Sequence, residues 1–306
     1  MIVASAFWGA SFIFTKGLFL SEPHITPTII LTGRMFIATI FTVPLLLLTG
    51  KWEPIRPGDL KFFLILAMLE PFFYSLCETG GIRFVSGTLA SIIIATIPLF
   101  IPFGMAIAYK ERLNGATILG VALSLVGIAI MSMGEDATLS ASPLGLFLLA
   151  LAVVIAVLYT LMLVKILGRY RPTTITTYQN LIALIYFLPL MLIKDHSQLP
   201  LLSFSPRMWF YLAFLGLFCS TCAYMMFNYG LHKLGATAGS VYNNIIPIFS
   251  LLLALLMGQE TITWTKVIGI VVVLVGLTLS QRKPTAQSAP TDAQPAEAKK
   301  SDTSTQ

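Results

Sequence analysis

The chain has 306 residues, of which 57% are hydrophobic and 10% are charged, and its formal net charge is +6. A water-soluble domain could not bury so much apolar surface, because globular domains carry ~25% charged residues. A transmembrane barrel is also disfavoured, since its strands alternate polar and apolar residues over segments of ~10 residues. The composition therefore predicts an all-α membrane protein with several spans.

A helix needs ~20 apolar residues to cross the ~30 Å hydrocarbon core of a bilayer. Ten segments approach or meet this length, over residues 2–20, 27–49, 59–79, 86–108, 114–133, 143–166, 173–193, 207–230, 236–258 and 264–281. Short polar breaks separate them. The first segment contains Lys16 and has no basic region before it, so we expect a retained span rather than a signal peptide.

Lysine and arginine in the short loops predict which side of the membrane each loop faces, because cytoplasmic loops are enriched in both. With the N-terminus in the cytoplasm, the inner segments hold 13 of these residues and the outer loops hold 4, namely Arg83, Lys194, Arg207 and Lys266. We expect a multi-pass protein of the plasma (inner) membrane with both termini cytoplasmic. The positive charge is explained by the inner loops and does not indicate a nucleic-acid partner.

The second half of the chain repeats the first at a constant offset of 149 residues. The recurring pairs include Gly81/Gly230, Thr88/Thr237, Ser91/Ser240, Pro98/Pro247, Phe100/Phe249, Glu111/Glu260, Gly120/Gly269 and Gly127/Gly276. Five predicted spans fall in each copy, and an odd number of spans inserts the copies in opposite orientations. We expect ten transmembrane helices as two inverted five-helix repeats, over residues 1–133 and 143–281.

The C-terminal segment differs from both copies. Residues 284–306 contain no Leu, Ile, Val, Phe, Trp or Tyr. A segment of this composition has nothing to bury, so residues 282–306 are predicted to be a disordered cytoplasmic tail.

Four charged residues fall inside predicted spans: Lys16, Arg34, Glu70 and Glu78. Each costs at least ~2.5 kcal/mol at a helix centre, so such residues usually serve a function. Glu70, Tyr74 and Glu78 are spaced at i, i+4 and i+8, which predicts one stripe on the third helix. The group can be interpreted as structural ion pairs and snorkelling side chains. The alternative is a charge network in which Glu70 or Glu78 binds a proton or the amine of a substrate.

The second repeat carries neutral polar and aromatic residues where the first carries charges. We expect a substrate site that combines these with Tyr74 and two aromatic residues of the first span; the candidates are Trp8, Phe12, Tyr74, Tyr159, Tyr224, Asn228, Tyr242, Asn243 and Asn244. Pro247 follows the asparagines closely and frees backbone carbonyls beside them. Hydrogen bonding between helices and aromatic packing remain alternatives. Glu111 and Glu260 are interpreted as groups that stabilise the starts of the fifth and tenth helices.

These features together resemble the EamA-like branch of the drug/metabolite transporter superfamily over about residues 1–281. The resemblance rests on Trp8-Gly9 followed by Lys16, on Arg34, and on the Pro98/Pro247 and Glu111/Glu260 pairs. It implies a ten-helix carrier of small metabolites with a central cavity lined by both halves. Two departures stand out. Only seven residues precede Trp8, which leaves open whether Met1 is the natural start, and Lys110 and Gln259 stand where the family often has Gly.

We therefore expect a secondary transporter, preferentially an exporter of small metabolites such as amino acids, with the proton as candidate coupling ion. A multidrug or nucleotide-sugar-type carrier and a non-transporting membrane scaffold are the alternatives. An enzyme is not expected, because His24, His196 and His232 lack metal-ligand spacing and no P-loop or nucleophile elbow occurs. The expected partners are a small-molecule substrate and the lipid bilayer, with no cofactor and no metal.

Overall fold

The computed structural model describes residues 1–109, 115–132, 141–163, 165–234 and 241–280. Every regular element in these ranges is helical, as the composition predicted. The predicted helix-start role of Glu111 and the predicted tail over 282–306 lie outside the described residues.

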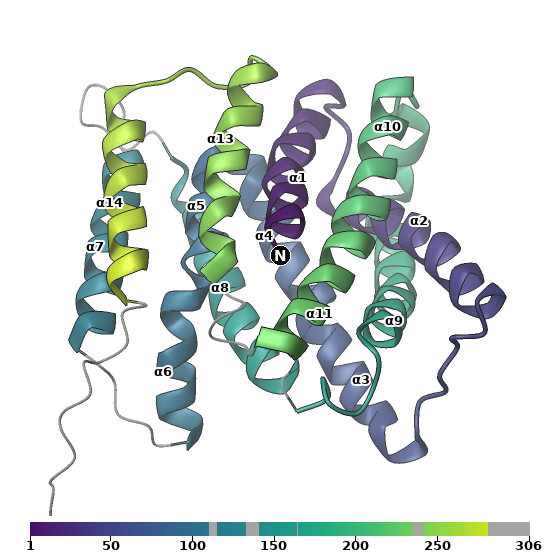
Figure 1. Cartoon of the computed structure of the whole chain (residues 1–306). Helices are drawn as coiled ribbons and strands as arrows, with labels where there is room; N and C mark the ends of the chain where they lie inside the picture. Colours follow the sequence, from purple (N-terminus) through teal and green to yellow (C-terminus); the bar gives the residue numbers. More distant parts are fainter. Residues whose placement is uncertain (110–114, 133–140, 164, 235–240, 281–306) are drawn as a thin grey trace, which may run out of the picture.

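Helices occupy much of each predicted span, although the predicted span over 86–108 is divided into two helices at Thr96 (Figure 1). The first half contains α1 (Ile2–Ser21), α2 (Pro27–Leu48), α3 (Leu60–Ala67), α4 (Tyr74–Phe84), α5 (Gly87–Ala95), α6 (Ile97–Tyr109) and α7 (Gly115–Ser132). The second half contains α8 (Pro143–Leu163), α9 (Pro172–Lys194), α10 (Pro206–Phe214), α11 (Tyr224–Leu234), α13 (Ile246–Leu256) and α14 (Trp264–Ser280). Short 3-10 turns cover Pro57–Asp59, His196–Leu201 and Val241–Ile245.

Within the described ranges, eight helical segments are long and apolar enough to cross a membrane. Two further apolar helices, Tyr242–Leu256 and Trp264–Ser280, are shorter. Large apolar side chains such as Phe147, Val154 and Leu158 on α8 are about half exposed, which is the surface a bilayer would cover.

Local sequence explains where several helices begin. The hydroxyl of Thr26 accepts a hydrogen bond from the Ile29 N–H at the start of α2, and Pro27 occupies the first turn. Ser86 caps α5 in the same way, and Ser205 caps α10 ahead of Pro206. Proline suits the first turn because its missing N–H would have no partner there.

Two π-helical segments interrupt predicted spans at equivalent places in the two halves. Met68–Phe73 separates α3 from α4, and Leu215–Ala223 separates α10 from α11. The backbone of Glu70 is not helical, with φ −143° and ψ 126°, and Pro71 follows it. The continuous third helix predicted over 59–79 is therefore wrong in this detail. Such interruptions are frequent at functional sites because they release backbone groups from the helix ladder.

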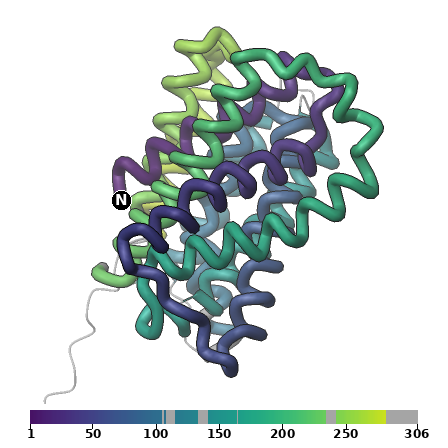
Figure 2. The backbone as a smooth tube through the Cα atoms, turned by 90° about the vertical axis from the view of Figure 1, so that its right-hand side faces the viewer, coloured from purple at the N-terminus to yellow at the C-terminus, as the bar shows by residue number. Residues whose placement is uncertain are grey.

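The two halves interleave instead of lying side by side. α1 packs against α13 and the π-helical segment Leu215–Ala223, α4 packs against α8, and α2 packs against α9. α7 and α14 form a separate close pair at the left edge of Figure 1. Figure 2 shows the same interleaving from the side, with segments from both ends of the chain sharing one layer.

Linkers of the two halves are also hydrogen bonded to one another beyond the helix ends. Glu22, which follows α1, accepts hydrogen bonds from Ser203 and from the Ser205 hydroxyl at 3.2 Å. Asp59, ahead of α3, accepts from the Tyr170 hydroxyl at 2.8 Å and from Arg169 at 3.2 Å. Each of these contacts joins a linker of the first half to a linker of the second half.

Candidate functional site

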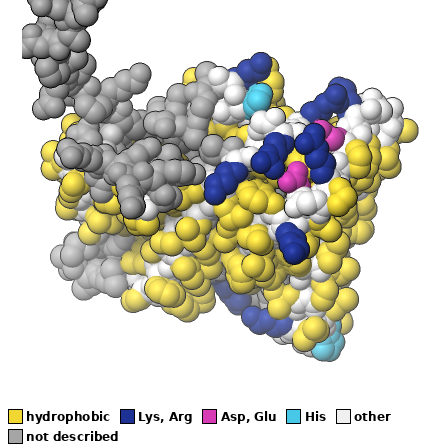
Figure 3. Space-filling model, turned by 90° about the horizontal axis from the view of Figure 1, so that it is seen from below, with side chains coloured by type: hydrophobic (Ala, Val, Ile, Leu, Met, Phe, Trp, Pro, Cys, Tyr) yellow, Lys and Arg dark blue, Asp and Glu magenta, His cyan; other side chains and the backbone are white. Residues whose placement is uncertain are grey.

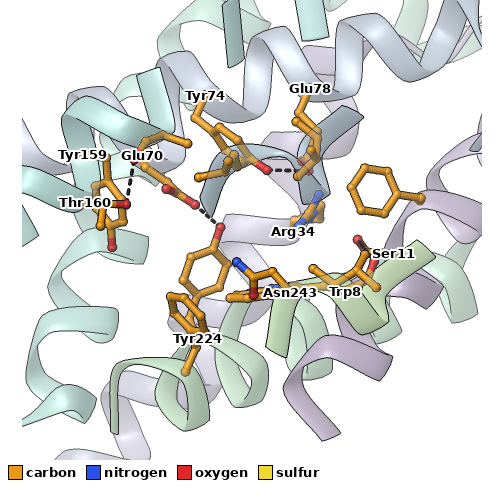
Figure 4. Close-up of a pocket in the computed structure, with 16 residues that line it drawn as sticks. Trp8, Ser11, Arg34, Glu70, Tyr74, Glu78, Tyr159, Thr160, Tyr224 and Asn243 are labelled. Carbon is orange, nitrogen blue, oxygen red and sulfur yellow. Dashed lines mark hydrogen bonds between the residues drawn. The ribbon is translucent and has the colours of Figure 1, made fainter. Parts of the chain in front are cut away.

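A cavity lies between the two halves, beside the π-helical segments (Figure 4). Its walls come from α1, α2, α4, α5, α6, α8, α11 and α13, from the π-helical segment Met68–Phe73 and from the turn Val241–Ile245. The lining residues are Trp8, Ser11, Phe12, Arg34, Glu70, Tyr74, Glu78, Ile94, Ile97, Ala156, Tyr159, Thr160, Tyr224, Phe227, Asn243 and Ile246. The space open to water-sized molecules is ≈ 70 Å³. One water needs about 10–15 Å³ on this measure, so the cavity holds several waters or a small solute.

Most of the predicted site residues meet in this cavity. They are Trp8, Phe12, Arg34, Glu70, Tyr74, Glu78, Tyr159, Tyr224 and Asn243. The stripe that the sequence predicted on the third helix is retained in effect, because Glu70 faces the same space as Tyr74 and Glu78 although its backbone has left the helix.

Four predicted site residues do not line the cavity. Lys16 donates to the carbonyls of Ile82 and Arg83, both at 3.2 Å, at the end of α4. Asn228 is fully buried and donates to the Thr176 hydroxyl at 3.1 Å. Tyr242 contributes its backbone carbonyl to the Ser5 hydroxyl at 2.8 Å, and Asn244 is only partly buried.

The charged centre of the cavity contains two carboxylates and one guanidinium. Arg34, Glu70 and Glu78 are each at least nine-tenths buried. Among the described residues, neither carboxylate lies within 4.0 Å of Arg34, so the interpretation of these charges as direct ion pairs with Arg34 does not hold. Instead, the Tyr74 hydroxyl donates to Glu78 at 2.9 Å and the Tyr224 hydroxyl donates to Glu70. The charges share a cavity without neutralising one another by contact.

Figure 4 shows Tyr74 and Glu78 on one side, Trp8 and Ser11 on the other, and Arg34 between them. This arrangement leaves the guanidinium facing both an acidic and an aromatic wall.

The aromatic wall is held by α1 and α11. The Trp8 indole N–H donates to the Cys219 carbonyl at 3.3 Å. The Trp8 ring meets the rings of Tyr224 and Phe227 edge-on, with centroids 5.1 and 4.8 Å apart. Phe12, one turn further along α1, is 1% exposed. Edge-to-face contacts of this kind fix ring orientation, so the wall is preformed.

A smaller polar chamber of ≈ 10 Å³, enough for about one water, adjoins the cavity. Arg34, Glu70 and Tyr224 line both spaces. Its other walls include Gln179 and Asn180, which the sequence interpretation did not select. Two adjacent amides inside an apolar span were a signal that could have identified them. Ser11, Thr160 and Phe227 were also missed, and nothing in their local sequence distinguishes them from packing residues.

Glu260 stabilises a different helix from the one predicted. Its carboxylate accepts from the Thr88 N–H at 3.0 Å, in the first turn of α5, and pairs with Lys266 at 3.1 Å. The N-terminal dipole is the expected physical reason, but the helix belongs to the other half of the chain. Glu260 therefore links the halves instead of starting α14.

Comparison with known proteins gives a consistent result. The model of the EamA-like transporter family matches residues 1–133 and 143–281. An uncharacterized transporter of Archaeoglobus fulgidus is 28% identical over 281 residues, covering 90% of this chain and 95% of that protein. Uncharacterized transporter YetK of Bacillus subtilis is 24% identical over 267 residues, covering 84% and 79%.

A protein of known crystal structure superposes with a TM-score of 0.64 at 16% identity, over 90% of this chain and 97% of that chain. This likeness shows a shared fold. The apolar helices and the family match together describe an integral membrane transporter, and the match covers both halves: the chain belongs to the EamA-like transporter family.

Proposed function

We propose that this protein is a secondary transporter that exports small metabolites, preferentially amino-acid-like zwitterions, by alternating access with proton coupling. The observation that carries the proposal is the buried cavity between the halves, which combines Arg34, Glu70 and Glu78 with a preformed aromatic wall. Sites of this kind bind small amphipathic solutes, because apolar surface supplies affinity and a few polar groups fix orientation.

Each part of an amino acid has a partner in the cavity. The Arg34 guanidinium suits the carboxylate, since its planar donors match that geometry. Glu70 and Glu78 suit the ammonium group, and Trp8 and Phe12 suit an apolar side chain.

The cavity contains one more carboxylate than guanidinium. A buried excess negative charge is costly, so it favours binding of either a proton or a solute ammonium. Competition between the two for the same carboxylate supports exchange of a proton for the solute. In a cell with an inward proton gradient, this exchange drives export.

We further propose that the two shorter helices, Tyr242–Leu256 and Trp264–Ser280, also cross the membrane and complete two inverted five-helix repeats. The equivalent π-helical segments of the two halves support this arrangement. The antiparallel contact of the repeat-equivalent helices α7 and α14 supports it as well. Halves related by a two-fold axis in the membrane plane can rock against a central site.

We propose that the protein lies in the plasma (inner) membrane with both termini in the cytoplasm. The side viewed in Figure 3 gathers several Lys and Arg side chains with a few acidic ones. Because cytoplasmic loops are rich in Lys and Arg, this side would face inward.

The proposal is tested by counterflow in proteoliposomes with leucine, phenylalanine, lysine and the cation tetraphenylphosphonium, with and without a pH gradient. We expect saturable counterflow of an amino acid and acceleration by the gradient in the wild type. Glu78→Gln should lose the gradient dependence, whereas the matched control Glu53→Gln, in the linker after α2, should retain it. Absence of counterflow across the panel would refute the carrier function, and an unaltered gradient response in Glu78→Gln would refute proton coupling at that residue.

A multidrug carrier is the second candidate. The excess carboxylate and the aromatic wall would also hold an organic cation through charge and cation–π attraction. Counterflow of tetraphenylphosphonium without any amino acid would favour this function over the first.

A further inference from the structure

We propose that Gln179 and Asn180 are positioning residues of the transport site: from α9 in the second half they hold Glu70 and Arg34 of the first half in place, and solute charge selectivity depends on them. The inference rests on the proposed carrier function. Neither amide lines the main cavity, and both are 3% exposed. They are neighbours on α9, so their side chains leave the helix about 100° apart and reach different partners.

Gln179 satisfies a carbonyl that the first π-helical segment releases. In a regular helix the Tyr74 N–H would bond to the Glu70 carbonyl, but here it bonds to the carbonyls of Leu69 and Pro71. The Gln179 amide donates to the released Glu70 carbonyl at 2.9 Å. It also donates to the Tyr159 hydroxyl at 3.1 Å, so it is tied to a wall of the main cavity.

Asn180 does the same for the second π-helical segment. The Tyr224 N–H bonds to the Thr221 carbonyl, which releases the carbonyl of Ser220. The Asn180 amide donates to the Ser220 carbonyl at 3.2 Å. The Ser220 hydroxyl in turn accepts from Arg34 Nε at 3.1 Å. Asn180 therefore fixes Ser220, and Ser220 fixes the guanidinium.

The two contacts make one connected unit. Glu70 and Arg34 are both anchored to α9, Glu70 through Gln179 and Arg34 through Ser220 and Asn180. A buried carbonyl left without its donor costs free energy and tends to move toward another partner. Removing either amide should thus displace the charged group it supports, although the amide never touches the solute.

The test compares Gln179→Met and Asn180→Leu with the matched control Gln259→Met. Gln259 is also an amide that donates to a backbone carbonyl of another helix, that of Ile13 at 3.1 Å, but neither residue lines either space. The first readout is transport kinetics. It comprises KM for the amino acid of the panel that is transported best, and the transport rate of that amino acid relative to the primary amine that differs from it only in lacking the carboxylate. For leucine this amine is 3-methylbutylamine.

We expect Asn180→Leu to raise KM for the amino acid about tenfold while the amine is affected less, because the carboxylate partner is displaced. Gln179→Met should weaken the binding of both the amino acid and the amine and should shift the pH profile of transport. Gln259→Met should leave selectivity and pH profile at the wild-type values. Equal selectivity in all variants, or the same shift in the control, would overturn the proposal.

A second readout does not depend on transport. The rate at which dicyclohexylcarbodiimide labels Glu70, located by mass spectrometry, reports how that carboxyl is presented. Gln179→Met should change this rate severalfold and Gln259→Met should not. If the wild type transports no solute but labelling changes as stated, the carrier function fails and the positioning role stands. Unchanged labelling in Gln179→Met removes the positioning role whether or not the wild type transports.

Discussion

Gly120 and Gly276 bring the backbones of α7 and α14 into direct contact. A Cβ atom placed on Gly120 would lie 2.5 Å from the Gly276 carbonyl oxygen, and one on Gly276 would lie 2.6 Å from the Gly120 oxygen. Gly127 and Gly269 repeat this reciprocal approach at 2.7 and 2.8 Å. Gly269 is the repeat equivalent of Gly120, and Gly127 is the repeat equivalent of Gly276, each at the offset of 149 residues. The second contact lies later in α7 but earlier in α14 than the first, so the two helices are antiparallel. The contact thus has the two-fold character expected of inverted copies.

Gly120→Ala should destabilise the protein by about 1–3 kcal/mol, because the added methyl group must separate two packed backbones. Gly269→Ala should cost a similar amount, since its Cβ would meet Met131 at 2.3 Å and the Gly127 oxygen at 2.8 Å. Gly115→Ala is the control, because nothing lies within 4 Å of its Cβ position. Thermal unfolding in detergent measures all three. Equal melting temperatures for Gly120→Ala and Gly115→Ala would contradict the close packing.

Trp8→Ala should raise KM for the transported solute roughly tenfold, because it removes the ring of the aromatic wall that contacts both Tyr224 and Phe227. Trp8→Phe should restore part of the affinity, since an aromatic ring remains, although it is smaller and lacks the N–H that donates to the Cys219 carbonyl. Trp264 is 81% exposed on the surface of α14, so Trp264→Ala is the matched control and should leave KM unchanged. Solute counterflow over a concentration series gives the three values. A Trp8→Ala protein with wild-type KM would remove this residue from the site.

Glu22 gives a pH dependence outside the spans. Burial disfavours its charged form, but hydrogen bonds from Ser203 and Ser205 outweigh this, and the pKa of Glu22 is lowered from 4.5. A carboxyl whose pKa is lower in the folded than in the unfolded protein stabilises the folded state at every pH above its unfolded-state pKa. This stabilisation is lost as the pH falls through its folded-state pKa. Glu22→Gln should therefore melt below the wild type at pH 7, and the difference should shrink below about pH 4.5.

Ser203→Ala tests the cause of that shift, because it removes one of the donors to Glu22. Its melting temperature should approach the wild-type value over the same acidic range. A gap between wild type and either variant that stays constant from pH 7 to pH 3 would show that the Glu22 carboxylate is not stabilised in this way.

Cysteine labelling tests the orientation. In a background without Cys77, Cys219 and Cys222, a cysteine at Ser197, between α9 and α10, should react with a membrane-impermeant maleimide in intact cells. A cysteine at Lys51, between α2 and α3, should react only after lysis. Both positions are exposed, so burial does not limit either reaction. The reverse pattern would invert the proposed topology.

The sequence alone determined the all-helical membrane class and the approximate positions of most helices, because lipid exposure and insertion depth depend on composition and on segment length. It also identified most residues of the cavity, since charges such as Arg34 and Glu78 are costly in a span and persist where they are used. The family resemblance that Trp8-Gly9 and the paired prolines suggested is confirmed by the family match.

Only the tertiary structure decided which polar groups meet. Lys16 and Asn228 carry the same local signals as the cavity residues, yet each donates to a partner on a distant segment. Glu260 accepts from the start of α5 and not from the helix that follows it in the chain. The roles of Gln179 and Asn180 depend on carbonyls released in two other helices. Hydrogen-bond satisfaction is a property of the packed molecule, because a buried group takes whichever partner the fold brings within 3 Å or so.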